Sequence, residues 1–156
     1  MPGGKLPKSL VKTIKRNSLI YKRSFTPVSK SSLEKKNTHQ WFALSAEYFE
    51  DDTYGPIITT WKTKVPLNFL NISTMKKRHR IAQELDRPLR QLDWLDCDEQ
   101  YAGGQENAKT QRMLMPVIRQ YKLDGTYIHD DEADEECCGA SEIVLVPQSI
   151  KKITKL

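Results

Sequence analysis

The apolar segment Ile143–Val146 limits the possible folds of this chain more than any other feature of its sequence. Its four residues stand in a row, and Pro147 follows them directly. A short, β-branched run of this kind, closed by a proline, predicts a buried β-strand. Glu142 opens the run, where burial can raise the pKa of a carboxyl group and fix its direction. A glutamate that faces water at a strand end is the simpler interpretation, and both interpretations stay open.

Further short segments have the alternation or the composition of strands. They are 19–25, 40–44, 57–64, 67–72 and 126–129, and the tail 149–156 is a candidate edge strand. Helices are predicted over 8–16, 46–53, 75–85 and 106–121, and loops over 26–38 and 86–105. The sequence thus predicts an α+β fold with a split, mostly antiparallel β core flanked by short helices. Its 156 residues suit a single domain, expected over 19–156 after a basic N-terminal arm at 1–18.

The composition is that of a polar globular protein, with 38% hydrophobic residues and a formal net charge of +5. No apolar run is long enough to cross a membrane, and the N-terminus lacks the apolar segment of a leader peptide. The three cysteines, two of them adjacent, do not predict a disulfide framework. The sequence has no Cys-x-x-Cys or His-x-x-x-His pair, so a structural zinc site is not expected. We therefore expect the protein inside the cell, in cytoplasm or nucleus, or in a virion if it is viral.

The charges are unevenly distributed along the chain. Residues 1–33 contain eight Lys or Arg and no Asp or Glu, whereas six acidic residues crowd into 130–136. A basic arm beside an acidic loop is typical of a protein that docks onto a protein partner or larger assembly, or that contacts nucleic acid. The basic cluster at 76–80, on the helix predicted over 75–85, could hold phosphates. A solvated tail and a solvated loop explain the first two features equally well, and a solvated helix face is the more common origin of a cluster such as 76–80.

Four short motifs follow one another along the chain. Tyr21-Lys22-Arg23-Ser24 stands on one predicted strand, Trp41–Ser45 on the next, and Tyr54-Gly55 after the following helix. A late turn and strand, Asp124–Ile128, then leads to Glu142. In order and spacing this set resembles the ADP-ribosyltransferase-like fold, whose members split NAD and transfer or hydrolyse the ADP-ribose. The resemblance is greatest to the divergent members of large DNA viruses, phages and bacterial toxins, and it covers about residues 19–152.

The resemblance implies roles for five residues, with NAD as the substrate. Arg23 matches the arginine that holds the phosphates or ribose of NAD, for which a forked guanidinium is suited. Tyr54 matches a tyrosine that packs near the nicotinamide, where flat rings stack. Glu142 matches a late glutamate that would bind a ribose hydroxyl and stabilise positive charge as nicotinamide leaves. Tyr21 and Ser45 complete the expected NAD-binding set.

Two departures from the family pattern bear on activity. Ala43 replaces the first hydroxyl of a Ser-Thr-Ser type motif, of which Ser45 remains. Ala140 replaces the second acid of the arginine-modifying members, so arginine is not the expected acceptor. Three functions stay open, because function belongs to sites and not to folds. They are a mono-ADP-ribosyltransferase with an unknown acceptor, a catalytically inactive structural or adaptor protein such as a minor virion or capsid component, and a nucleic-acid-binding module.

Overall fold

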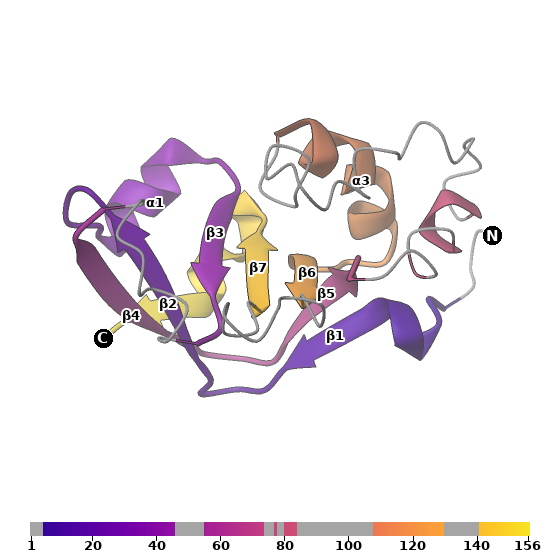
Figure 1. The fold of residues 1–156 in the computed structure, drawn as a ribbon, viewed down its shortest axis with the longest axis horizontal. Helices are drawn as coiled ribbons and strands as arrows, with labels where there is room; N and C mark the ends of the chain where they lie inside the picture. The colour runs from indigo at the N-terminus through magenta and orange to yellow at the C-terminus, as the bar shows by residue number, and fades with distance from the viewer. Residues whose placement is uncertain (1–4, 46–54, 74–76, 78–79, 84–107, 130–140) are drawn as a thin grey trace, which may run out of the picture.

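Strands dominate the described part of the chain, where hydrogen bonds join eight of them into one curled sheet (Figure 1). The computed structural model describes residues 5–45, 55–73, 77, 80–83, 108–129 and 141–156. The strands are β1 (Val11–Ile14), β2 (Leu19–Ser24), β3 (Gln40–Ala43), β4 (Ile57–Thr63), β5 (Leu67–Asn71), β6 (Gly125–His129), β7 (Ser141–Leu145) and β8 (Ile153–Lys155). The helical elements are η1 (Lys8–Leu10), α1 (Lys30–Lys36), α3 (Ala108–Gln120) and η5 (Pro147–Lys152). The protein is therefore α+β and consists mostly of strands.

The strand order is β1-β5-β6-β7-β3-β2-β4-β8. Neighbouring strands pair antiparallel except β5 and β6, which run parallel. Parallel neighbours need a crossover connection, and the chain between β5 and β6 includes α3. The predicted antiparallel character is confirmed, but the described strands form one continuous sheet instead of a split core. The narrowest link joins β2 and β3, where Tyr21 pairs with Ala43.

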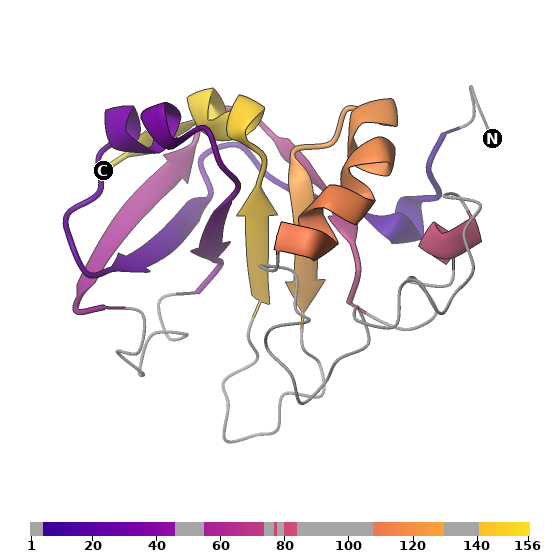
Figure 2. The same ribbon diagram turned by 90° about the horizontal axis from the view of Figure 1, so that it is seen from above.

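One face of the sheet buries the larger aromatic side chains. Phe42 and Trp61 pack edge to face, with ring centroids 6.0 Å apart and an interplanar angle of 78°. Ile143 of β7, Leu33 of α1 and Ile150 of η5 belong to the same buried cluster. Because α1 and η5 also contact each other, they lie side by side over this face (Figure 2). This packing fixes one side of β3 and β7.

Helix α3 packs on the opposite face, over β5 and β6. Its Leu114, Val117 and Ile118 recur at helical spacing and are buried with Leu70 of β5. Near the start of the helix, Nε2 of Gln111 donates a hydrogen bond to the Thr126 hydroxyl of β6 at 3.1 Å. No helix among the described residues is long and apolar enough to span a membrane.

Most predicted elements are confirmed. The strands expected at 19–25, 40–44, 57–64, 67–72 and 126–129 correspond to β2 to β6, and the apolar run near the end corresponds to β7. The long helix expected at 106–121 is α3, and the expected edge strand of the tail is β8, preceded by η5. Of the helix expected at 75–85, residues 77 and 80–83 are described and are helical. The helix expected at 46–53 and the loop expected at 86–105 lie outside the described residues.

The prediction of a loop over 26–38 is wrong, because this segment contains α1. The Ser29 hydroxyl accepts a hydrogen bond from the Ser32 N–H, and the Ser32 hydroxyl accepts one from the Ser29 N–H, both at 3.1 Å. This reciprocal capping box satisfies two amide groups that a helix start otherwise leaves unpaired. Leu33 then anchors the helix, since it is fully buried against the sheet.

The prediction of a helix over 8–16 is also wrong, because these residues form η1 and β1. The apolar residues that indicated a helix, Leu6, Leu10 and Ile14, do not share one face. Leu10 precedes β1 and belongs to the buried cluster under α3, whereas Ile14 belongs to the cluster of the larger aromatic side chains. β1 pairs antiparallel with β5, from Val11 opposite Leu70 to Ile14 opposite Leu67. The second half of the basic segment 1–18 therefore supplies an edge strand of the sheet.

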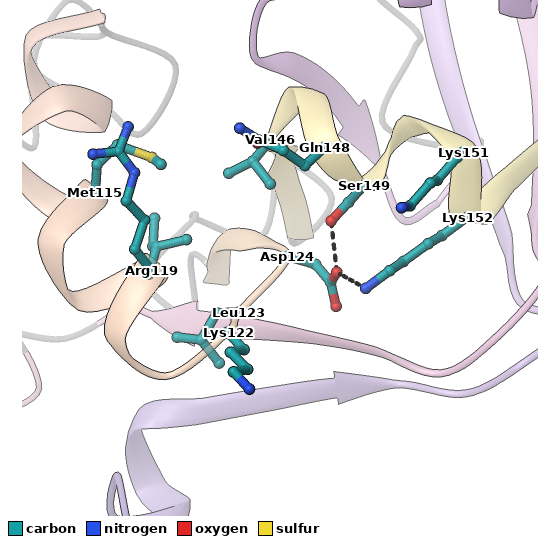
Figure 3. A pocket seen from close by; sticks show the side chains of 11 residues that line it. Met115, Arg119, Lys122, Leu123, Asp124, Val146, Gln148, Ser149, Lys151 and Lys152 are labelled. Carbon is teal, nitrogen blue, oxygen red and sulfur yellow. Dashed lines mark hydrogen bonds and ion pairs between the residues drawn. The ribbon is translucent and has the colours of Figure 1, made fainter. Parts of the chain in front are cut away.

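A buried carboxylate joins β6 to β5 and η5. Asp124 is 3% exposed, and its Oδ1 accepts hydrogen bonds from the Ser149 hydroxyl and from Nζ of Lys152, both at 2.6 Å (Figure 3). Its Oδ2 accepts the N–H of Asn68 at 2.8 Å. The next residue must be a glycine, because Gly125 has a φ of +150° and a Cβ would lie 1.8 Å from the Val144 carbonyl oxygen. This junction fixes the turn between α3 and β6.

Candidate functional site

Four of the strands that carry the sequence motifs are consecutive neighbours in the sheet. In the order β2, β3, β7 and β6, Tyr21 pairs with Ala43, Ala43 with Glu142, and Glu142 with Ile128. Residues that pair directly across strands point to the same face of a sheet. Tyr21 and Glu142 therefore share one face, with the small side chain of Ala43 between them.

Arg23 and Trp41 extend this row, because alternate residues of a strand point the same way. Arg23 lies two residues after Tyr21 on β2, and Trp41 lies two residues before Ala43 on β3. We call the surface formed by Tyr21, Arg23, Trp41, Ala43 and Glu142 the β2–β3–β7 face. Sequence reasoning did not single out Trp41 as a site residue, although its alternation with Ala43 was a signal that could have found it.

The β2–β3–β7 face is partly accessible. Tyr21, Arg23, Trp41 and Glu142 are all half-buried, whereas Ala43 is fully buried. Side chains that are partly covered can be held in place and still reach a ligand. The opposite side of the same strands carries Phe42 and Ile143, which are completely buried. Polar and aromatic groups thus lie on the face of β2, β3 and β7 that points away from the aromatic core.

The guanidinium of Arg23 is held in a defined position. Its Nη1 donates a hydrogen bond to the carbonyl oxygen of Gly55 at 2.6 Å. Gly55 has a φ of +115°, and a Cβ there would lie 2.2 Å from the backbone carbon of Ser24. Only glycine fits this close approach of two backbones without strain. The chain therefore presents a fixed carbonyl to Arg23, and a positioned guanidinium is suited to binding phosphate.

Lys22, in the middle of the same motif, does not belong to the site. Its Nζ donates a hydrogen bond to the carbonyl oxygen of Trp41 at 3.1 Å and lies 5.2 Å from the centre of the Phe42 ring. Because Phe42 belongs to the aromatic core, Lys22 points to the face opposite Arg23. Because side chains alternate along β2, Tyr21 and Arg23 lie on the β2–β3–β7 face, whereas Lys22 lies on the face that carries Phe42.

Ser45 lies near the same end of the sheet as Glu142. The N–H of Leu44 donates to the carbonyl oxygen of Ser141 at 3.0 Å, so the end of β3 lies beside the beginning of β7. Ser45 follows directly and is half-buried. Tyr54, the fifth predicted site residue, lies outside the described residues, and its neighbour Gly55 is the residue that holds Arg23.

His39 lies just before β3, and burial lowers the pKa of its imidazole, which favours the neutral ring. The part of the chain that the structure describes contains no group of three or more His, Cys, Asp or Glu that could hold a metal ion.

Comparison of the sequence with the known protein families finds no matching family, and comparison with curated proteins finds no similar sequence. Any function must therefore be argued from the residues of the β2–β3–β7 face. These are a positioned guanidinium, two aromatic rings and a carboxylate. Together they can hold a phosphate-bearing ligand that has flat rings and that develops positive charge.

Proposed function

We propose that the protein binds NAD on the β2–β3–β7 face and transfers its ADP-ribose to an acceptor. In this proposal Arg23 holds the phosphates, and Glu142 is the catalytic carboxylate. One observation supports it above the others. Tyr21, Arg23 and Glu142, which lie on segments far apart in the sequence, share one face of adjacent strands.

Each side chain has a group that suits one part of NAD. The forked donors of Arg23 match the oxygens of a pyrophosphate, and its bond to Gly55 reduces the freedom lost on binding. Tyr21 and Trp41 offer flat rings for nicotinamide or adenine, because aromatic rings attract a flat cation. Ser45, near the end of β3 beside Glu142, adds a hydroxyl for a ribose or for the nicotinamide amide.

Glu142 would act on the ribose that loses nicotinamide. When the bond between the nicotinamide nitrogen and the ribose carbon breaks, its electron pair stays on nitrogen and positive charge develops on the ribose. A carboxylate beside that ribose stabilises this charge, and it can orient the 2′-hydroxyl by accepting a hydrogen bond. A nucleophile of the acceptor, or water, then bonds to the same carbon and loses its proton. Arginine is not the expected acceptor, because Ala140 stands where arginine-modifying members of the ADP-ribosyltransferase-like fold carry their second acid.

Nicotinamide release from NAD tests this role of Glu142. The reaction is followed with wild type, Glu142→Gln and the matched control Glu34→Gln, an exposed glutamate of α1. We expect release by wild type, with water or lysate proteins as acceptors, and a loss of about a hundredfold or more in Glu142→Gln alone. Equal rates in wild type and Glu142→Gln would overturn the assignment, as would no release with either acceptor.

A second candidate is a catalytically inactive adaptor on the same fold. Exposed apolar side chains favour a protein contact beside the site: Phe25 is 70% exposed, Leu19 43% and Ile58 44%. Leu19 and Ile58 stand on β2 and β4, with the same alternation as Tyr21 and its partner Thr60. Binding of NAD without nicotinamide release would favour this candidate. The nucleic-acid-binding alternative would use the basic arm at 1–18 and the helix expected at 75–85, of which residues 77 and 80–83 are described.

A further inference from the structure

A cavity of about 330 Å³ lies between the end of α3 and η5, beyond the C-terminal end of β7. Glu142 stands at the other end of β7, so this cavity is separate from the β2–β3–β7 face. Its volume is at the lower end of the range for small-molecule sites, about 300–1,000 Å³. We call it the η5 cavity.

Four cationic side chains line the η5 cavity. Arg119 and Lys122 come from the end of α3 and the turn after it, and Lys151 and Lys152 come from η5 (Figure 3). Lys152 is neutralised by Asp124, at 2.6 Å. Arg119, Lys122 and Lys151 make no ion pair with any residue that the structure describes. Asp124 is the one acidic residue among those that line the cavity, so the four cations leave it with an excess of positive charge.

Positive charge continues along the flank of η5. Nζ of Lys30 donates to the Lys151 carbonyl oxygen at 3.4 Å, and the backbone N–H of Lys64 donates to the Lys152 carbonyl oxygen at 2.8 Å. Burial and the neighbouring Lys64 ammonium lower the pKa of Lys30. The Glu34 carboxylate raises this pKa, but by less than the other two effects lower it. Like charges that are crowded in this way repel one another, and a bound anion relieves the repulsion.

The remainder of the cavity lining is largely apolar. Met115, Ile118, Leu123 and Val146 supply most of this wall. Three of them, Ile118, Leu123 and Val146, belong to the buried cluster under α3. An apolar wall beside a group of cations suits a ligand with a phosphate at one end and a flat or apolar body at the other.

We propose that the η5 cavity binds a phosphorylated small molecule of the nucleotide class. The charged ends of Arg119, Lys122 and Lys151 point apart in Figure 3. Binding therefore draws these exposed side chains toward the phosphates, while the base packs against the apolar wall. A simpler origin of the charges is that cations stabilise the last turn of a helix through its dipole. That explanation accounts for the cations at each helix end but predicts no ligand.

Equilibrium titrations with inorganic pyrophosphate, adenosine and ADP test the proposal. The test variant is Arg119→Gln/Lys151→Gln, whose two positions are exposed. The control, Lys35→Gln/Lys36→Gln, removes the same charge from the exposed last turn of α1. Arg23→Ala separates this site from the β2–β3–β7 face, and Lys122→Gln replaces the double variant if that one does not fold.

We expect ADP to bind wild type more tightly than either pyrophosphate or adenosine does. The double variant should bind ADP at least about tenfold more weakly than wild type does, because it loses two charge-assisted contacts. The control should retain ADP affinity within about twofold, and a component of ADP binding should persist in Arg23→Ala. Equal losses in test and control variants would overturn the proposal, and so would the absence of ADP binding. Binding of a short single-stranded DNA without binding of ADP would overturn it in favour of nucleic acid.

Discussion

At the scale of single residues, a few polar side chains have structural roles that their position in the sequence did not reveal. Asp124 belongs to a turn motif before β6, and it is also the hydrogen-bond acceptor that connects β5, β6 and η5. Arg23 is expected to contact a ligand, and its guanidinium also donates a hydrogen bond to the Gly55 carbonyl oxygen. Both residues depend on partners that are distant in sequence, so their local neighbours do not predict these contacts.

Substitution of Asp124 should destabilise the fold without any direct effect on the β2–β3–β7 face. Asp124→Ala leaves the Ser149 hydroxyl, the Lys152 ammonium and the Asn68 N–H without their acceptor. We expect a loss of about 2–3 kcal/mol in the free energy of unfolding, because buried polar groups lose their hydrogen bonds. Urea unfolding measures it, with exposed Glu34→Ala as the control, expected to change stability by less than about 0.5 kcal/mol. An equally small change in Asp124→Ala would contradict this role.

At the scale of secondary-structure elements, the strands were predictable because β-branched and aromatic residues mark them locally. The helix α1 was not predictable in this way, since 26–38 has the Ser, Lys and Asn content of a loop. Its capping box uses Ser32 where the common pattern has Glu or Gln, so the sequence carried no clear start signal. β1 was missed because Leu6, Leu10 and Ile14 recur at helical spacing, although Leu10 precedes the strand and packs in a different buried cluster from Ile14.

The capping box should account for a measurable part of the stability of α1. Ser29→Ala removes the hydroxyl that accepts the Ser32 N–H, so we expect a loss of about 1 kcal/mol in the free energy of unfolding. The control is Ser9→Ala, which changes an exposed serine of η1. Chemical denaturation of both variants checks the prediction. If Ser29→Ala were as stable as Ser9→Ala, the capping box would not be needed to hold α1.

At the scale of the whole molecule, the strand order creates the candidate site. β6 and β7 come late in the chain but lie between β5 and β3, and this insertion sets Glu142 beside Ala43. The resemblance suggested which residues to examine, yet residue spacing does not predict which strands pair. The shared face of Tyr21 and Glu142 is therefore a property of the sheet. The η5 cavity likewise forms only where α3 and η5 approach each other.

The most direct test of NAD binding on the β2–β3–β7 face is a calorimetric titration with NAD. It compares wild type with Arg23→Ala and with Arg16→Ala, which changes an exposed arginine. We predict that wild type and Arg16→Ala bind NAD alike, and that Arg23→Ala binds at least about tenfold more weakly, because it loses a charge-assisted contact to phosphate. No binding by wild type at millimolar NAD, or equal binding by all three proteins, would contradict the proposed site.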